Sequence, residues 1–395
     1  MMLSGGYTTT PVAPLLATTY NLLLTEEAPA KALAQRKLPA RSLTEWLPKE
    51  DAMALYTAAV KLAANAVGRI DLAGKLLDGK GPVENLPGMF LDCCIKALVR
   101  LEAVKRAAQE VDIAGWLTHE DITVEGKAMT LWCRANGIPS LHVPHGNYGW
   151  APKENRVDTE LFCDKAAVGG TYQRDWYVER GCDPARIIIT GNPAWDFRFG
   201  VKIDKPWAKG LFQLDPKRPL VTWASSWSLG MTRTAKDEYL EEQYRKFLYA
   251  TKEMLGPQFG VSVHPNSHKQ GLEWYAREAE KAGARVMVTQ GHLEELMQAT
   301  DCLITINESN ITTCAAQYGV PVLAAGGYED GCPGILRLDG RPVADGVREC
   351  MSEGWDREFQ SRRGEYMRMF DDCQGDAARR VAEVLVSMTG GGDGA

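Results

Sequence analysis

The sequence predicts an α/β protein of two domains, each built on a doubly wound parallel sheet. The chain has 395 residues, which is too long for one hydrophobic core and suits two domains of ordinary size. Short apolar runs alternate with segments of helical spacing in both halves of the chain, as in parallel α/β sheets. Two of these runs, 143–147 and 261–266, contain a histidine followed at once by a turn-forming residue.

In the first half, the alternation is clearest from residue 112 to residue 195. An apolar strand at 113–117 leads into a helix that stops at Gly137, where a helix C-terminus favours glycine. The remaining elements are expected as strands at 138–143, 166–168 and 187–190 and a helix that closes at Gly181. Before residue 112 the pattern is weaker and predicts a strand at 20–24 and helices at 52–67 and 89–111.

In the second half, the pattern resumes after a weakly apolar stretch at 199–217, which we interpret as an interdomain linker. Strands are expected at 220–224, 260–263, 285–288, 302–306 and 320–324, with helices at 235–255 and 271–282 and a helical tail at 349–388. The predicted division is an N-terminal domain at 1–200, a C-terminal domain at 201–375, and a final helix with a frayed tail at 376–395.

The overall charge gives the molecule no general attraction to polyanions. The sequence has 45 Lys and Arg residues against 51 Asp and Glu residues, a net charge of −6. A local basic stretch at Lys31, Arg36, Lys37 and Arg41 is typical of a solvated helix face. No apolar run is long enough to cross a bilayer, and the first residues do not resemble a signal peptide, so we expect a cytoplasmic protein.

Several familiar signatures fail on inspection. The ten cysteines contain no Cys-x-x-Cys pair, which favours buried free thiols over a zinc or redox site. Residues 74–80 match the glycine and lysine of a phosphate-binding loop, but Gly81 replaces the hydroxyl residue that would hold magnesium. His119-Glu120 opens like a zinc-protease helix, but Thr123 occupies the place of the second histidine. No Gly-x-Gly-x-x-Gly follows a strand, no Gly-x-Ser-x-Gly occurs, and no Asp-x-Asp pair is present for a metal–diphosphate. We therefore expect no cofactor and no metal site.

The histidines at predicted strand ends are the strongest functional signal. His145 and His264 each follow an apolar strand, and the carboxyl edge of a parallel sheet is where such sheets bind ligands. Because one lies in each half, two sheet edges facing across a cleft are expected to bring them to one site. His119 also lies near a predicted strand end, and His142, His268 and His292 are equally consistent with ordinary backbone-bonded residues.

A second signal follows the predicted strand at 302–306. Asn307, Glu308, Ser309 and Asn310 come directly after it, and a helix of small residues begins at Ile311. Ser309 or Asn310 is a suitable N-cap, and the free amides of a helix N-terminus favour an anionic phosphate. A cap without a ligand fits the same residues equally well.

These segments resemble the GT-B glycosyltransferases, in particular the branch of CDP-glycerol glycerophosphotransferases and capsular polysaccharide transferases. More distantly, the chain is similar to the non-hydrolysing UDP-GlcNAc 2-epimerases. The resemblance covers about residues 112–321 and 375–388, and it is carried by segments 117–146, 190–196, 221–227, 264–265 and 292–321. It implies a nucleotide-sugar-dependent enzyme of GT-B fold, with two Rossmann-like domains facing across a cleft.

The resemblance also implies roles for particular residues. On the donor side, His264 would bind phosphate together with Ser225, Ser226 and the segment Asn307, Glu308, Ser309 and Asn310. These groups would stabilise the leaving phosphate in place of a metal ion. His145 would take the proton of the acceptor hydroxyl, with Glu120 and Asp121 as rival bases or as partners that orient it.

The sequence departs from the epimerase pattern at Thr313 and Cys314, where the epimerases have glutamates. The carboxylate expected to hold the nucleotide ribose is thus missing there, and Glu308, Glu329 or Asp330 could replace it. The reading we favour is metal-independent transfer of a sugar or related group to a saccharide, polyol or other hydroxyl acceptor. The alternatives are glycosylation of hydroxymethylated pyrimidines in DNA, polyol-phosphate transfer, 2-epimerisation, and carbohydrate binding without catalysis. A peripheral membrane contact also stays open.

Overall fold

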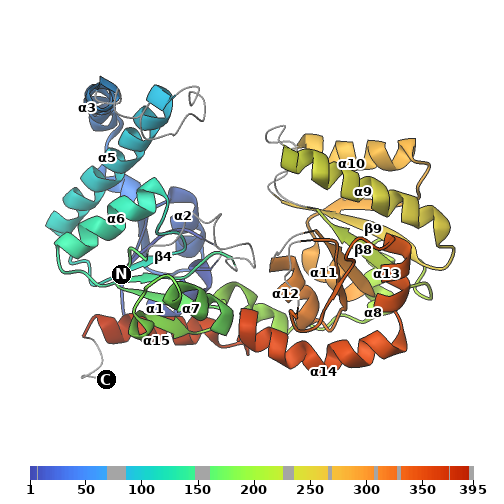
Figure 1. Ribbon diagram of the computed structural model, residues 1–395. Helices are drawn as coiled ribbons and strands as arrows, with labels where there is room; N and C mark the ends of the chain where they lie inside the picture. Colours follow the sequence, from blue (N-terminus) through green and yellow to red (C-terminus); the bar gives the residue numbers. More distant parts are fainter. Residues whose placement is uncertain are drawn as a thin grey trace.

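The computed structural model describes residues 1–6, 8–68, 86–146, 161–225, 235–265, 269–306, 310–326, 331–372 and 374–390. Two parallel sheets with helices on both faces form two domains that lie side by side (Figure 1). This confirms the predicted α/β class and the two-domain arrangement. In the part of the chain that the structure describes, no helix is long and apolar enough to cross a membrane.

The N-terminal sheet has seven strands in the order β3-β2-β1-β4-β5-β6-β7. The chain first builds outward from β1 through β2 to β3 and then returns to the other side of β1 with β4, so a topological switch point lies between β1 and β4. The strands are β1 (Met2–Leu3), β2 (Leu22–Leu24), β3 (Ala40–Ser42), β4 (Trp116–Thr118), β5 (Ser140–His142), β6 (Lys165–Val168) and β7 (Ile187–Ile189).

Helices cover both faces of this sheet, and α3 and α5 project beyond it (Figure 1). Helix α6 begins at the N-cap Thr123, whose side chain accepts a hydrogen bond from the Gly126 amide. The α-helices are α1 (Ala13–Leu16), α2 (Glu27–Gln35), α3 (Lys49–Gly68), α5 (Leu86–Glu110), α6 (Val124–Ala135) and α7 (Thr171–Val178). Short 3-10 turns occupy Thr10–Val12, Leu43–Trp46, Pro184–Arg186 and Pro193–Phe199.

The C-terminal sheet has six strands in the order β10-β9-β8-β11-β12-β13, with its own switch point between β8 and β11. Its core is aromatic, with Trp223, Tyr244, Phe247 and Tyr275 fully buried. The strands are β8 (Leu220–Ala224), β9 (Gln258–Val263), β10 (Met287–Gln290), β11 (Cys302–Thr305), β12 (Val322–Ala324) and β13 (Ile335–Arg337). The helices are α8 (Lys205–Leu211), α9 (Ala235–Glu253), α10 (Lys269–Lys281), α11 (Leu293–Ala299), α12 (Asn310–Gln317), α13 (Val343–Cys350) and α14 (Glu353–Phe370).

The stretch at 199–217 is more than the linker that its composition indicates. It contains helix α8, which begins at the N-cap Asp204 and buries Ala208 in the core of the C-terminal domain. Lys209 on this helix is only 3% exposed, and its Nζ lies 2.9 Å from a carboxylate oxygen of Asp301. The lysines of this segment are typical of a solvent-exposed linker, but the charge of Lys209 is paired with Asp301 inside the domain.

The chain crosses between the domains twice. The first crossing follows the 3-10 turn at Pro193–Phe199, and the second leads from α14 into α15 (Ala377–Met388). Helix α15 lies under the N-terminal domain (Figure 1), where Val381 and Leu385 are fully buried in that domain's core. Asp196 joins the two crossings, because its carboxylate accepts hydrogen bonds from the first two amides of α15 at 2.9 and 2.7 Å.

Candidate functional site

The predicted base and its neighbour meet at the carboxyl edge of the N-terminal sheet. Glu120 follows β4 and His145 follows β5, and these strands are adjacent and parallel. Nδ1 of His145 lies 3.2 Å from Oε1 of Glu120. Both side chains are open to solvent, with 46% and 28% of their surface exposed. When Nδ1 carries the proton directed at Glu120, Nε2 is the ring nitrogen that carries the lone pair and can act as a base.

Asp121, the third residue expected here, occupies a different environment. It is 1% exposed, and its Oδ2 accepts hydrogen bonds from the amides of Phe162 (2.9 Å) and Cys163 (3.3 Å). Its other oxygen lies 3.6 Å from Nδ1 of His142, which is also buried. Asp121 thus holds the chain that enters β6 and has no open path to an acceptor, whereas Glu120 is the carboxylate in contact with His145.

A residue that the sequence did not single out fixes the turn at His145 and Gly146. Gln173 on α7 is 2% exposed and donates from Nε2 to the carbonyl oxygen of Gly146 at 2.6 Å. Its Oε1 accepts a hydrogen bond of 2.8 Å from the Gly169 amide. Both ends of the amide are therefore used, and the turn that carries His145 is tied to the N-terminus of α7.

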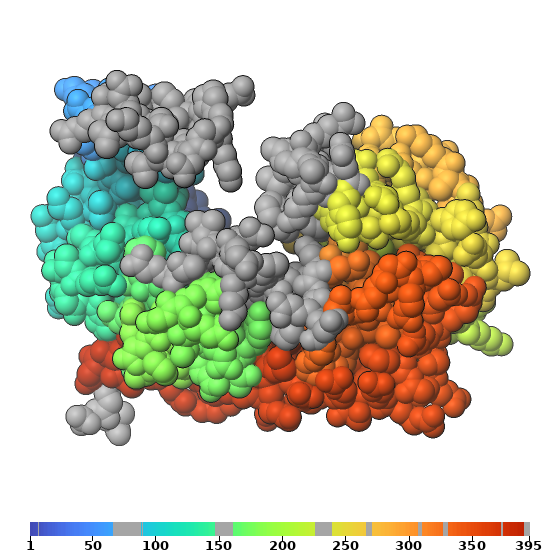
Figure 2. Space-filling model, viewed as in Figure 1, coloured from blue at the N-terminus to red at the C-terminus, as the bar shows by residue number. Residues whose placement is uncertain are grey.

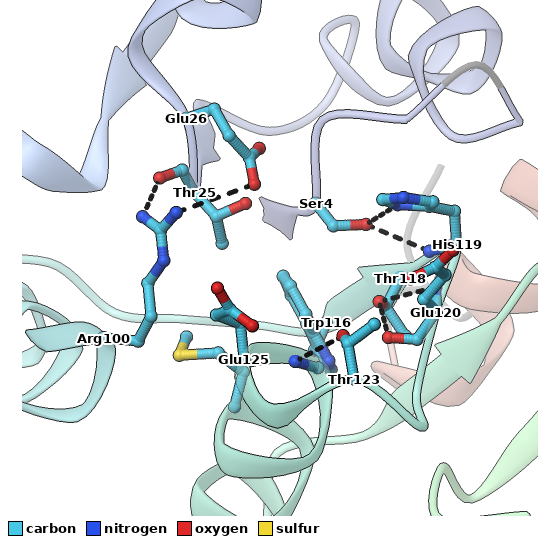
Figure 3. Close-up of a pocket in the computed structure, with 12 residues that line it drawn as sticks. Ser4, Thr25, Glu26, Arg100, Trp116, Thr118, His119, Glu120, Thr123 and Glu125 are labelled. Carbon is cyan, nitrogen blue, oxygen red and sulfur yellow. Dashed lines mark hydrogen bonds and ion pairs between the residues drawn. The ribbon is translucent and has the colours of Figure 1, made fainter. Parts of the chain in front are cut away.

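A pocket of about 240 Å³ lies beside Glu120, at the switch point between β1 and β4 (Figure 3). His119 forms one wall, and Ser4 Oγ accepts a hydrogen bond from its amide at 3.0 Å and lies 2.9 Å from its Nδ1. Burial lowers the pKa of His119. The lining residues are Ser4, Thr25, Glu26, Arg100, Trp116, Thr118, His119, Glu120, Thr123, Glu125, Gly126 and Met129.

This pocket was missed because β1 is only two residues long, but the sequence does carry a trace of it. The loop after β1 is Ser4-Gly5-Gly6, and both glycines permit a close approach of the backbone. A Cβ on Gly5 would lie 2.6 Å from Oε2 of Glu26, and one on Gly6 would lie 2.4 Å from the ring of His119. The Gly5 amide instead donates to Glu26 at 2.6 Å.

Two of the predicted donor residues, Ser225 and His264, meet at the carboxyl edge of the C-terminal sheet. Ser225 follows β8 and His264 follows β9, and Ser225 Oγ accepts a hydrogen bond of 2.8 Å from the His264 amide. The carbonyl oxygen of His264 accepts from Nε2 of Gln290 at 2.9 Å. Partial burial lowers the pKa of the His264 imidazole. Ser226, Asn307, Glu308 and Ser309, together with Glu329 and Asp330, lie outside the described residues.

Asn310 links the two sheet edges. It begins α12, and its Nδ2 donates to the carbonyl oxygen of His145 at 3.3 Å. The contact is close, because a Cβ on Gly146 would lie 3.3 Å from the same nitrogen. In the space-filling view the two domains are in contact along the lower part of the molecule (Figure 2). Asn310 of the predicted donor side and His145 of the predicted acceptor side are therefore in direct contact.

A buried polar cluster lies where the chain crosses between the domains. Arg198 forms a bidentate ion pair with Glu294, with nitrogen–oxygen distances of 2.8–3.0 Å. Asp371 at the end of α14 is fully buried and accepts hydrogen bonds of 2.9 Å from the Asn192 amide and from Nε2 of Gln317. Burial raises the pKa of Asp371 to about 8. These contacts tie both crossing segments to the C-terminal domain.

Within the described residues, no group of three or more His, Cys, Asp or Glu side chains is placed to hold a metal ion. The nine described cysteines are free thiols, and six of them are buried.

Comparisons with known proteins identify the fold. No family model and no curated protein matches the sequence. Among solved structures, a UDP-N-acetylglucosamine 2-epimerase matches over 100% of this chain and 96% of its own, with a TM-score of 0.61 and 12% identity. The UDP-GlcNAc 2-epimerase of Neisseria meningitidis bound to UDP-GlcNAc matches over 98% and 99%, with a TM-score of 0.59 and 11% identity. HepE of Anabaena, solved with UDP and glucose, matches over 98% and 99%, with a TM-score of 0.58 and 14% identity. The chain therefore has the GT-B fold.

Proposed function

We propose that this protein is a glycosyltransferase that moves a sugar from a nucleotide-activated donor to a hydroxyl acceptor. The observation that carries the proposal is the pair of His145 and Glu120, 3.2 Å apart, which stands next to a pocket and opposite the His264 edge of the other domain. A base, an acceptor site and a phosphate-binding edge are the three parts that such a transfer requires.

On the donor side, Ser225 follows β8, which borders the switch point of the C-terminal sheet, and His264 follows the adjacent strand β9. Ligands of open α/β sheets bind at such points. Two similar structures contain UDP or UDP-GlcNAc, which supports a nucleotide sugar as the donor class. An N–H of the His264 imidazole would donate to phosphate. Burial lowers the pKa of this imidazole in the protein without ligand. The negative charge of a bound phosphate would favour the protonated ring and so act against this effect.

On the acceptor side, Nε2 of His145 would remove the proton from the acceptor hydroxyl, while Glu120 holds Nδ1 and stabilises the imidazolium that forms. The acceptor oxygen would then bond to the anomeric carbon as the bond from that carbon to the phosphate oxygen breaks. The electron pair of the broken bond leaves with the nucleotide, whose new charge His264 would stabilise.

The 2-epimerase reaction is the main competitor, because epimerases are among the similar structures. Transfer is favoured by the residues at the corresponding helix. Thr313 is fully buried with its hydroxyl 3.4 Å from that of Tyr366, and Cys314 is also fully buried. Neither position offers the ribose-binding carboxylate that the epimerase pattern has. The pocket beside Glu120 also provides room for a second substrate, which an epimerase does not need.

Glycosylation of DNA receives less support. The basic stretch of the N-terminal domain is partly neutralised by its own neighbours, because Lys31 pairs with Glu27 and Arg41 pairs with Glu45. Affinity for DNA depends on basic groups that are free to contact many phosphates.

Two measurements test the proposal. Thermal unfolding with UDP, CDP, CMP, GDP and their sugar conjugates identifies the nucleotide, because a ligand of the folded state raises the melting temperature. The conjugate that binds is then incubated alone and with hydroxyl acceptors. Release of nucleotide that depends on the acceptor, with a glycosylated product, is the expected result. Conversion of the sugar conjugate to its 2-epimer without any acceptor would overturn the proposal in favour of the epimerase.

A further inference from the structure

The pocket beside Glu120 has the shape and chemistry of a site for one sugar-sized polyol. Its volume of about 240 Å³ is just below the range for drug-sized ligands. Trp116 and Met129 provide apolar surface, and four of the other lining residues carry hydroxyl groups, namely Ser4, Thr25, Thr118 and Thr123. Apolar surface with a few placed polar groups is the usual composition of a small-molecule site.

One of these hydroxyl groups is buried and forms no hydrogen bond with the described residues. Thr25 is 3% exposed, and its Oγ1 has no hydrogen-bond partner in the part of the chain that the structure describes. By contrast, Ser4 is bonded to His119, and Thr118 is bonded to the backbone of Glu120 at 3.0 Å. A buried hydroxyl without a partner is costly unless another molecule completes its hydrogen bonds. Thr25 lines the pocket, and a rotation of its side chain could bring this hydroxyl to a ligand there.

The charges of the pocket exclude an anionic ligand. Three carboxylates line it, from Glu26, Glu120 and Glu125, against the single guanidinium of Arg100. Arg100 is already engaged, since it donates to the carbonyl oxygen of Thr25 and lies 3.8 Å from Glu26 Oε1. His119 adds no charge at neutral pH, because burial lowers its pKa. A phosphate or carboxylate placed here would meet net negative charge in a partly desolvated site.

Glu125 gives the site a more specific preference. It lies in the first turn of α6, and its carboxylate points towards the middle of the pocket, between Arg100 and Trp116 (Figure 3). Among the described residues Glu125 forms no ion pair and no hydrogen bond through its carboxylate. Lys96 on α5 is near enough for an electrostatic effect, but its Nζ is bound to Asp92 at 2.7 Å. An ammonium group on the ligand would complete the pairing of Glu125.

We propose that the acceptor bound in this pocket is an amine-bearing polyol of monosaccharide size, with its ammonium group on Glu125 and one hydroxyl on Thr25. The claim that this ligand is the acceptor rests on the proposed function. It is made because Glu120 belongs both to the pocket and to the pair with His145. The binding preference itself needs no catalytic activity and can be measured separately.

The test uses the full chain and three matched probes, methyl glucoside, methyl glucosaminide and methyl glucuronide, titrated at pH 7 and followed by ligand-observed NMR. We expect the glucosaminide to bind about 10-fold more tightly than the glucoside, the order of one hydrogen bond to a charged group. The glucuronide should be the weakest of the three. In Glu125→Gln the preference for the amine should vanish, and in Thr25→Val all three probes should bind several-fold more weakly.

Glu27→Gln is the matched control, because Glu27 is an exposed carboxylate that pairs with Lys31 outside the pocket. Its binding pattern should equal that of the original protein. The inference is overturned if the glucuronide binds best, if the amine preference persists in Glu125→Gln, or if the folded protein binds none of the probes. Nucleotide binding, measured on the same samples, separates this result from a failure of the proposed function.

Discussion

The side-chain amide of Asn310 donates a hydrogen bond of 3.3 Å to the carbonyl oxygen of His145, and this contact joins the two domains at the site. Asn310 begins a helix of the C-terminal domain, whereas His145 belongs to the N-terminal sheet edge. On the other side of the same turn, Gln173 holds the carbonyl oxygen of Gly146 at 2.6 Å. The backbone around the proposed base is thus fixed from both domains, so its position depends on how they close.

Replacement of His145 by alanine should leave nucleotide affinity nearly unchanged and lower turnover by roughly 10²–10⁴-fold, the usual effect of a lost general base. Affinity is measured by calorimetry and turnover by nucleotide release. Glu120→Gln should lower turnover less, because it removes the orienting charge at 3.2 Å and leaves the imidazole in place. Wild-type turnover in His145→Ala would remove this residue from the mechanism.

Replacement of His264 by alanine should weaken nucleotide binding about 10-fold or more, since a hydrogen bond to phosphate contributes about 1.5–3 kcal/mol. His292→Asn is a suitable control, because His292 is exposed and has a positive φ of 52° that asparagine also tolerates. Equal affinities of the His264 variant and the control would show that the imidazole does not contact the donor.

Gln173 is expected to act by positioning His145. Gln173→Glu keeps an acceptor for the Gly169 amide but has no donor for the Gly146 carbonyl when it is ionised. Turnover should fall at neutral pH with little change in nucleotide affinity, and it should recover partly at lower pH, where a protonated carboxyl group can donate. Gln173→Leu should show the loss without the recovery. Identical pH profiles of the two variants would argue for a structural role alone.

Much of this fold could be predicted from the sequence. A buried parallel strand is a continuous apolar run, and such runs alternate with helices in both domains. Strand β8 has the bounds predicted from the sequence, Leu220–Ala224. Ser225 and His264 are in contact, as expected for residues that follow two adjacent parallel strands. Strand β1 escaped prediction because Met2 and Leu3 alone set no period.

The pocket escaped prediction for a related reason. Its walls come from β4, from the residues that follow β1, β2 and β4, and from α5 and α6, and only the folded sheet brings Thr25 and Arg100 next to Glu120. The role of Asp121 was equally hidden, because sequence position does not tell whether a carboxylate beside a strand end points outward or holds buried amides.

Transfer should continue in the presence of EDTA, because protein donors such as His264 can stabilise the leaving phosphate without a cation. The measurement is nucleotide release at a saturating donor concentration, before and after dialysis against the chelator. Complete loss of activity, restored by magnesium or manganese, would reveal a metal requirement and refute this prediction.

Asp371 should make the protein less stable as the pH rises. Burial raises its pKa from 3.8 to about 8 in the folded protein, so the unfolded chain loses this proton near pH 4 and the folded chain keeps it until about pH 8. Between these values unfolding releases a proton, and the free energy of unfolding falls by at most about 1.4 kcal/mol per pH unit from this group. Below pH 4 and above pH 8 the contribution is constant.

Asp371→Asn removes this dependence while its oxygen still accepts from the Asn192 amide. Measured by urea unfolding between pH 5 and pH 8.5, the stability of the variant relative to the original protein should therefore rise steadily with pH. The neighbouring charges of Asp196, Arg198 and Arg380 are common to both proteins, so their effects largely cancel in the comparison. Parallel stability profiles would mean that Asp371 is already ionised in the folded protein, held by the two hydrogen bonds from Asn192 and Gln317 and by the charge of Arg198.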